Sequence, residues 1–285
     1  MNPNPKRLLA WGALLPFIPG CVVVVGDGSW GCGGPRVHTT QSEDRPLDTI
    51  GLTALEISTH NGTIDFQGQD GGQGSVAITK KAGGATEADA QEAMDAIEVF
   101  VESAGSGTTR IGWKWRVVKK PRWSGEVNFV VRAPRTLRLD TETHNGEIAI
   151  ADVQGDVRAE THNGRVKVNS RGGSLHAESH NGEIQATYAG PKLTITTHNG
   201  EVVADLSRCG AVTGDVTTHN GAVSLSVGSE TSAAIRCETS NGELRSDAAL
   251  ADMKKSRGKL TGTLGSGVGK LDVTTHNGGI HLRRS

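Results

Sequence analysis

The sequence predicts an all-β chain that folds as a parallel β-solenoid, a stack of similar coils. The first observation is a repeated stretch, Thr-His-Asn-Gly, with two near copies at 179–182 and 239–242. The second is its spacing, since successive asparagines are separated by 84, 18, 18, 18, 21, 21 and 36 residues. A fixed short period is the signature of a repeat architecture. The eight asparagines are Asn61, Asn145, Asn163, Asn181, Asn199, Asn220, Asn241 and Asn277.

The third observation is alternation of apolar and polar residues on both sides of each repeated stretch. The residues six and four positions before the asparagine are mostly apolar, as in Leu193 and Ile195, with polar residues between them. Period-two alternation indicates a strand with one buried face. Asn-Gly indicates a sharp turn, because both residues tolerate positive φ. The residue three positions after the asparagine is always branched and apolar: Ile64, Ile148, Val166, Ile184, Val202, Val223, Leu244 and Ile280.

Two architectures fit a strand, corner, strand unit: a parallel solenoid, or stacked antiparallel β-hairpins. The constant 18-residue gap favours coils in register, and the 21-residue gaps fit three-residue bulges. In a solenoid of roughly 18–21-residue coils, equivalent asparagines would lie ~4.8 Å apart and could form a hydrogen-bonded ladder. We therefore favour the solenoid.

The N-terminus predicts export. Lys6 and Arg7 precede a short apolar run, and Gly20-Cys21 ends it in a pattern that resembles a bacterial lipobox. Residues 1–21 are therefore interpreted as a lipoprotein-type signal peptide with lipid on Cys21. An uncleaved anchor and plain secretion are the alternatives. Residues 22–50 contain many glycines and read as a flexible tether. The protein would be lipid-anchored in the bacterial cell envelope, facing the periplasm or the exterior.

Composition narrows the class of protein. The chain has 285 residues, a net charge of −1 and 39 glycines, and only 4% of it is aromatic. These values suit thin coils, and near-neutral charge argues against nucleic acid as a partner. Four cysteines in a long exported chain do not make a disulfide scaffold. Cys237 occupies an inward position, so we expect a buried thiol that does not pair with Cys209.

The 84-residue gap predicts a cap on the first end of a domain that spans 51–285. Residues 69–134 contain strand patterns and a helix that opens at Thr86, with Ala90, Ala93 and Met94 on one face. Capping protects the end of a solenoid. The 36-residue gap near the C-terminus predicts a degenerate coil at Leu260, Gly262 and Leu264, and a short helix at 248–255.

Two segments carry a family resemblance. Gly-Glu-Val-Asn-Phe-Val-Val-Arg-Ala-Pro begins at Gly125, and Leu-Arg-Leu-Asp-Thr-Glu-Thr-His-Asn-Gly-Glu-Ile begins at Leu137. Together they resemble the bacterial putative-adhesin family, exported β-solenoid-like repeat proteins of unknown function. The resemblance covers roughly 51–285 and implies roles in surface adhesion or envelope stress. It carries over no catalytic residues.

The histidine that precedes seven of the eight asparagines is the first candidate site. Stacked imidazoles could ligate Zn²⁺ or Cu²⁺. The alternative is a solvated corner residue duplicated with its repeat, and we expect this, with at most weak metal binding and no cofactor. The candidate metal ligands are His144, His162, His180 and His198.

The segment from Trp113 to Trp123 is the second candidate site. It holds five cations and three tryptophans without an acid, a composition suited to anionic glycan, phosphate polymer or lipid headgroups. The alternative is a strand that buries Trp113, Trp115 and Val117 on one face. The candidate contact residues are Trp113, Lys114, Trp115, Arg116, Lys119, Lys120, Arg122 and Trp123.

The sequence contains no nucleophile motif, phosphate loop or cysteine-pair zinc site. It predicts an envelope-anchored, non-catalytic, adhesin-like or scaffold protein that presents an elongated solenoid surface. Its partners would be the membrane, through the lipid, and an envelope polymer or protein. The alternative is a metal-binding envelope protein that uses the histidine column. A weaker third hypothesis is a carbohydrate-active enzyme on a β-helix, with outward Glu147, Glu183, Glu201 and Glu243.

Overall fold

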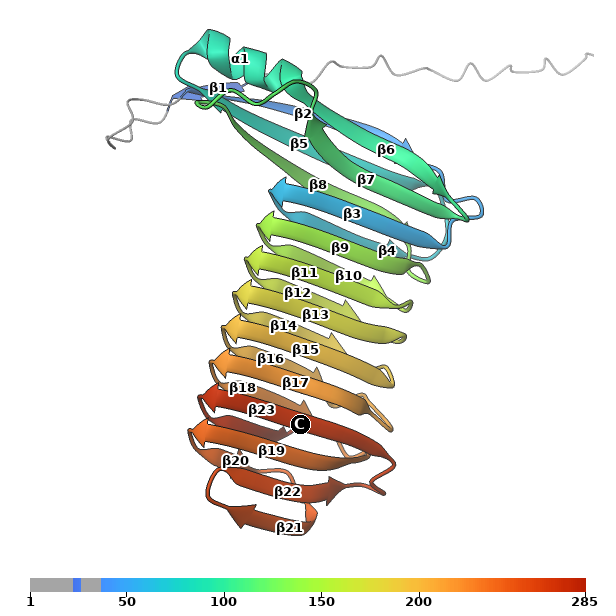
Figure 1. The fold of residues 1–285 in the computed structure, drawn as a ribbon. Helices are drawn as coiled ribbons and strands as arrows, with labels where there is room; N and C mark the ends of the chain where they lie inside the picture. Colours follow the sequence, from blue (N-terminus) through green and yellow to red (C-terminus); the bar gives the residue numbers. More distant parts are fainter. Residues whose placement is uncertain (1–22, 27–36) are drawn as a thin grey trace, which may run out of the picture.

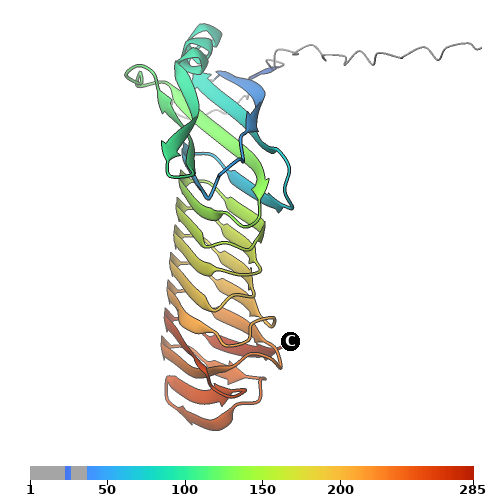
Figure 2. The same cartoon turned by 90° about the vertical axis from the view of Figure 1, so that its right-hand side faces the viewer.

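The structure, a computed structural model, describes residues 23–26 and 37–285. Two twelve-stranded sheets lie face to face in a long stack, as Figures 1 and 2 show. Each coil contributes the strand before its Asn-Gly corner to sheet I and the strand after it to sheet II. Equivalent strands of neighbouring coils pair in parallel, with Asn163 aligned to both Asn145 and Asn181. The predicted parallel solenoid is confirmed, and the hairpin alternative is wrong.

The coils follow the repeated stretch closely. In sheet I their strands are β3 (Ala54–Asn61), β9 (Arg138–Asn145), β11 (Val157–Asn163), β13 (Ser174–Asn181), β15 (Lys192–Asn199), β17 (Thr213–Asn220), β19 (Ala233–Asn241) and β23 (Gly269–Asn277). In sheet II they are β4 (Ile64–Gln69), β10 (Ile148–Val153), β12 (Val166–Ser170), β14 (Ile184–Tyr188), β16 (Val202–Leu206), β18 (Val223–Val227), β20 (Leu244–Ser246) and β24 (Ile280–Arg284).

The core runs between the sheets along the whole stack. Alternate residues of every coil strand point inward. The strand register aligns apolar residues of neighbouring coils with one another, as Val157 is aligned with Leu139 and with Leu175. All three are at most 3% exposed. Burial of such columns stabilises the fold by about 25 cal/mol per Å² of apolar surface. Neighbouring coils therefore depend on one another for their core.

The excursion between the first two coils forms the predicted cap. The strands β2 (Val37–Leu47), β5 (Gly74–Gly84) and β8 (Ser124–Pro134) extend sheet II, and β1 (Val23–Gly26) pairs with β2. A hairpin of β6 (Ile97–Gly105) and β7 (Thr108–Trp115) extends sheet I, because β7 pairs in parallel with β3.

The predicted helix, α1 (Glu87–Ala96), packs against β5 and β2 in this cap. The hydroxyl of Thr86 accepts a hydrogen bond from the Asp89 amide at 3.1 Å, as the capping pattern predicts. The apolar face of the helix, with Ala90, Ala93 and Met94, is buried. Across the part of the chain that the structure describes, no helix combines the length and hydropathy that a membrane span requires.

Residues 37–47 correct the predicted tether. Within the segment 22–50 they form β2, which pairs with β5 from Val37 to Leu47. Only Thr39 and Leu47 are buried in β2, so the strand lacks the apolar alternation that would identify it in the sequence. Its backbone pairing places it in the sheet. The signal peptide and Cys21 lie outside the described residues.

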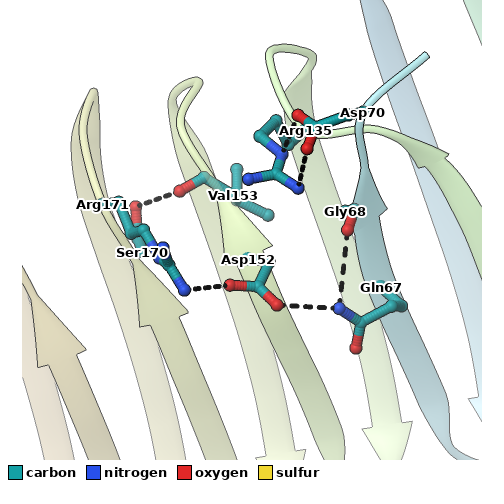
Figure 3. Close-up of polar contacts among 8 residues, drawn as sticks. All are labelled: Gln67, Gly68, Asp70, Arg135, Asp152, Val153, Ser170 and Arg171. Carbon is teal, nitrogen blue, oxygen red and sulfur yellow. Dashed lines mark hydrogen bonds and ion pairs between the residues drawn. The ribbon is translucent and has the colours of Figure 1, made fainter.

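Polar contacts join the two ends of the excursion. The Arg135 Nη2 donates to Asp70 Oδ2 at 2.9 Å, and Arg135 Nε lies 2.9 Å from Asp70 Oδ1 (Figure 3). Beside this pair, Asp152 accepts a hydrogen bond from Gln67 at 3.0 Å and another from Arg171 at 2.8 Å. These contacts bridge the first three coils at the corner opposite the Asn-Gly corner.

The order of the last coils departs from the sequence order. The final coil strand, β23, pairs in parallel with both β17 and β19, so the final coil lies between its two predecessors. The stack therefore runs Asn220, Asn277, Asn241. Figure 1 shows the C-terminus inside the stack rather than at its end.

The far end is closed by a hairpin of β21 (Ala251–Ser256) and β22 (Lys259–Leu264), and β22 pairs antiparallel with β19. The predicted degenerate coil at Leu260 and Leu264 and the predicted helix at 248–255 are therefore wrong. The 36-residue gap from Asn241 to Asn277 equals two 18-residue periods, but the intervening chain forms a hairpin and not an additional coil.

Candidate functional site

Three of the four repeated corner residues hold neighbouring coils together. The Thr161 hydroxyl donates to the carbonyl oxygen of Gly146 at 3.1 Å, and the Asn163 amide donates to the Asn145 side chain at 2.8 Å. The asparagine bonds form an unbroken ladder through all eight coils, with distances of 2.8–3.0 Å. The predicted ladder is confirmed.

The corner glycines are required by close packing. A Cβ built on Gly164 would lie 1.8 Å from the Gly146 carbonyl oxygen. Among the eight corner glycines only Gly62 has positive φ, at 144°. The expected reason for the glycine, a left-handed turn, is therefore wrong for the other seven.

The fourth corner residue, histidine, points outward and forms a continuous column. Neighbouring ring centroids are 4.7–5.0 Å apart, and the ring planes differ by 4–23°. The column ends where Ser240 replaces histidine beside His276. Its members in spatial order are His60, His144, His162, His180, His198, His219 and His276.

The stacked geometry bears on metal binding by this column. A Zn–N bond is ~2.0–2.1 Å, so two nitrogens on one ion are at most ~4.2 Å apart. Nitrogen lone pairs lie in the ring plane, and planes stacked about 5 Å apart direct them in parallel rather than toward a common point. His144, His162, His180 and His198 are brought together as predicted, but two of them would have to tilt to share an ion.

A tryptophan pocket lies at the cap end of the column. It has a volume of about 620 Å³, and its lining includes His60, Trp113, Trp115, Lys119, Arg122 and Trp123. The Trp115 ring centroid lies 5.5 Å from that of Trp113 and 5.7 Å from that of Trp123. The Trp113 indole N–H donates to the Thr59 hydroxyl at 2.9 Å, which ties the pocket to the first corner.

Three of the five cations in the segment already have partners. Lys114 pairs with Glu98 at 3.6 Å and Lys120 with Glu92 at 2.5 Å, while Arg116 donates to a backbone carbonyl. Lys120 also lies 5.1 Å from the centroid of the Trp123 ring. Within 23–26 and 37–285, Lys119 and Arg122 form no ion pair, and both line the pocket. The pocket thus has two uncompensated positive charges.

The alternative, one strand that buries Trp113, Trp115 and Val117 on one face, is wrong, because Trp113 and Trp115 are only half-buried and Val117 is exposed. The strand β7 ends at Trp115, and Val117 is 54% exposed. The buried tryptophan is instead Trp123, which is 3% exposed. Val118, the residue after Val117, is 93% exposed in the loop between β7 and β8.

Sequence reasoning missed that His60 and Asn61 also line this pocket. They come from the first corner, more than fifty positions earlier in the chain. The two segments meet because β3 and β7 pair in parallel, with Ile57 aligned to Ile111. The sequence between the first two coils has no repeat period that would predict the pairing of β3 with β7.

In the described part of the chain Cys237 is buried and does not pair with Cys209, as predicted, and Cys209 is also buried. Cys237 aligns with Val273 in the inward column of sheet I. Burial raises the pKa of the Cys237 thiol to about 12 and that of Cys209 to about 11. Both thiols are therefore protonated and unreactive in the folded protein near neutral pH.

Comparison with known proteins found similar solved structures and one family match. The chain is similar to a solved structure of a putative cell adhesion protein from Clostridium sporogenes, with 11% identity and a TM-score of 0.38, over 86% of this chain and 100% of that one. It is also similar to a putative adhesin from Bacteroides fragilis, with 12% identity and a TM-score of 0.38, over 85% of this chain and 97% of that one. No curated protein matches the chain. Residues 189–283 match the Toastrack DUF4097 family, and the resemblance to the bacterial putative-adhesin family is thereby confirmed.

Proposed function

We propose that this protein is an envelope-anchored, non-catalytic, adhesin-like protein that presents its tryptophan pocket to anionic groups of the envelope. The pocket is the observation that carries the proposal. Its two uncompensated cations suit a phosphate or carboxylate group, and its indole rings offer flat apolar surface beside them. The exposed Val118 directly precedes the pocket residue Lys119 and offers an apolar contact to the same partner.

The direction in which the chain enters the fold supports this use of the pocket. In the sheet register His38 pairs with Gly83, and Gly83 pairs with Ser124, which lines the pocket. The chain that leads to Cys21 therefore enters the fold beside the pocket. Cys21 stands two positions before Val23, which pairs with Thr40 of β2, and two residues span at most ~7 Å. A lipid on Cys21 would therefore keep the cap end close to the membrane.

A structural role for the corners supports the non-catalytic part of the proposal. Seven of the eight corner hydroxyls donate to a glycine carbonyl of the neighbouring coil, as Thr197 does to Gly182 at 3.0 Å. The asparagine amides are held in the ladder. These hydroxyls and amides hold neighbouring coils together. We therefore assign the stack of coils the role of a scaffold that carries the pocket.

A vesicle-binding experiment tests the proposal. The chain from residue 22, without lipid, is mixed with phosphatidylglycerol vesicles, with phosphatidylcholine vesicles, and with soluble polyphosphate. We expect binding to the anionic vesicles or to polyphosphate, weakened by salt because the attraction is electrostatic. The two anionic probes distinguish a lipid headgroup from a free polymer.

Two charge-reversal variants provide the control. Lys119→Glu with Arg122→Glu removes the pocket charges, and Lys254→Glu with Arg257→Glu makes the same change in exposed residues at the other end. We expect at least about tenfold weaker binding in the first variant only. Equal losses in both variants, or no loss in either, would contradict the proposal.

A further inference from the structure

A second cluster of ligand-type side chains lies on the outer face of sheet I. Glu160 comes from β11, and His176 and Glu178 come from the neighbouring β13, which Figure 1 shows in the middle of the stack. His176 is aligned with Arg158 and lies diagonally across from Glu160. The His176 Nε2 atom is 3.2 Å from Glu160 Oε1 and 3.6 Å from Glu178 Oε2.

These separations match those of a metal coordination sphere. Zn²⁺ is bound by imidazole nitrogen and carboxylate oxygen at ~2.0–2.2 Å in tetrahedral geometry, which places ligand atoms ~3.4 Å apart. One ligand atom from each of the three residues lies within 4.8 Å of the others. An ion can therefore be accommodated by small side-chain rotations, without movement of the sheet.

The charge around the cluster favours a cation. Glu160 is aligned with Glu142 on one side and Glu178 on the other, and like charges directly opposite each other destabilise a sheet. Arg158 pairs with Glu160, and its Nε atom also lies 3.9 Å from Asp140. The Arg158 guanidinium is thus shared between Glu160 and Asp140. It can keep Asp140 as its partner when the Glu160 side chain rotates to bind a metal ion.

The cluster is specific to these two coils. The position of His176 is occupied in other coils by acid, arginine or threonine, so no other coil places an imidazole beside two carboxylates. The equivalent residues are Glu56, Asp140, Arg158, Thr194, Asp215, Asp272 and Arg236. Unlike the histidine column, whose rings are parallel, these three side chains converge.

We propose that Glu160, His176 and Glu178 form a binding site for a divalent transition-metal ion, with Zn²⁺ the best fit. One nitrogen and two carboxylate oxygens suit Zn²⁺ better than Mg²⁺ or Ca²⁺, which prefer oxygen ligands alone. Three protein ligands leave a fourth position for water or for a group on a partner. This site is independent of the tryptophan pocket and of the proposed function.

Titration calorimetry with Zn²⁺ on the untagged full chain, stripped of metal with a chelator, tests the site. We expect one saturable site with a dissociation constant of about 10 µM or tighter. His176→Ala and Glu178→Gln should each weaken binding at least about tenfold. Arg158→Gln should strengthen it, because it removes the competing partner of Glu160. Mg²⁺ should give no comparable heat.

His180→Ala is the matched control, because His180 is an exposed imidazole on the same strand and belongs to the column. It should leave the affinity unchanged. Co²⁺ provides a second readout, since tetrahedral Co²⁺ should absorb in the visible with wild-type protein and not with His176→Ala. Absence of a saturable site, retention of full affinity in His176→Ala, or equal loss in His180→Ala would overturn the proposal. Circular dichroism of each variant checks that the sheet is intact.

Discussion

Substitution of one corner glycine tests why the repeat needs Gly. In Gly182→Ala the new Cβ would lie 1.8 Å from the Gly164 carbonyl oxygen. A carbon–oxygen contact needs ~3.3 Å, so the two coils must separate locally by about 1.5 Å. That shift breaks two hydrogen bonds at the same corner, from Ser179 to Gly164 at 3.0 Å and from Asn181 to Asn163 at 2.9 Å.

The expected cost follows from these contacts. Each hydrogen bond contributes ~1 kcal/mol. Overpacking in a site that cannot relax costs a further ~1–3 kcal/mol. We therefore expect Gly182→Ala to lower the free energy of unfolding by about 3–5 kcal/mol, a large share of the ~5–15 kcal/mol typical of a folded protein.

Urea unfolding followed by circular dichroism measures the loss, and amide hydrogen exchange locates it. Exchange should accelerate in β13, β14 and the coils that flank them, because repeat proteins are stabilised by nearest-neighbour contacts. Gly210→Ala is the control, since its Cβ would meet nothing within 4 Å and Gly210 has no positive φ. A loss in Gly182→Ala no larger than that in Gly210→Ala would refute the close-packing explanation.

Three further outcomes are expected. Thiol reagents should label Cys237 only after denaturation, because it is 1% exposed; rapid labelling of the folded chain would contradict the register. Burial raises the folded-state pKa of Cys237 from 9.0 to about 12 and that of Tyr188 from 10.0 to about 12, so their neutral forms stabilise the fold. This stabilisation should be complete below pH 9 and fall as the pH rises toward 12, and a urea midpoint that stays constant over that range would contradict it. Intact-mass analysis of the membrane fraction should find a lipidated chain that begins at Cys21; a mature chain that retains residues 1–20 would refute the lipid anchor.

Much of the solenoid can be predicted from the sequence because each corner is locally specified. The Asn145 amide has a partner in Asn61 and another in Asn163, so the ladder follows from the repeat once coils stack in register. The histidine column follows from the same register. The cap helix was also predictable, since Thr86 and the apolar positions after it are local signals.

The order of the last coils could not be predicted, because the repeat does not encode which coil lies beside which. Asn277 is as good a neighbour for Asn220 as Asn241 would be, and the structure uses Asn277 on both sides. The strand β2 was missed because its place depends on backbone pairing rather than on buried side chains.

Sites that combine distant segments were also beyond the sequence. The approach of Trp113 to Thr59 depends on the pairing of β7 with β3. The convergence of His176 on Glu160 depends on a diagonal contact across two coils. Sequence patterns specify which face a side chain occupies, and these sites are defined by which strands are neighbours.

Photocrosslinking in the intact envelope tests most directly whether the cap end is the end that binds. A photoreactive residue is placed at Val118, which is 93% exposed beside the tryptophan pocket, or at Met253, which is 55% exposed in β21 at the opposite end. We expect adducts with a phosphate- or carboxylate-bearing envelope component from position 118, reduced by Lys119→Glu with Arg122→Glu, and none from position 253. Adducts from position 253 alone, or equal adducts from both positions, would contradict the assignment of the pocket as the binding end.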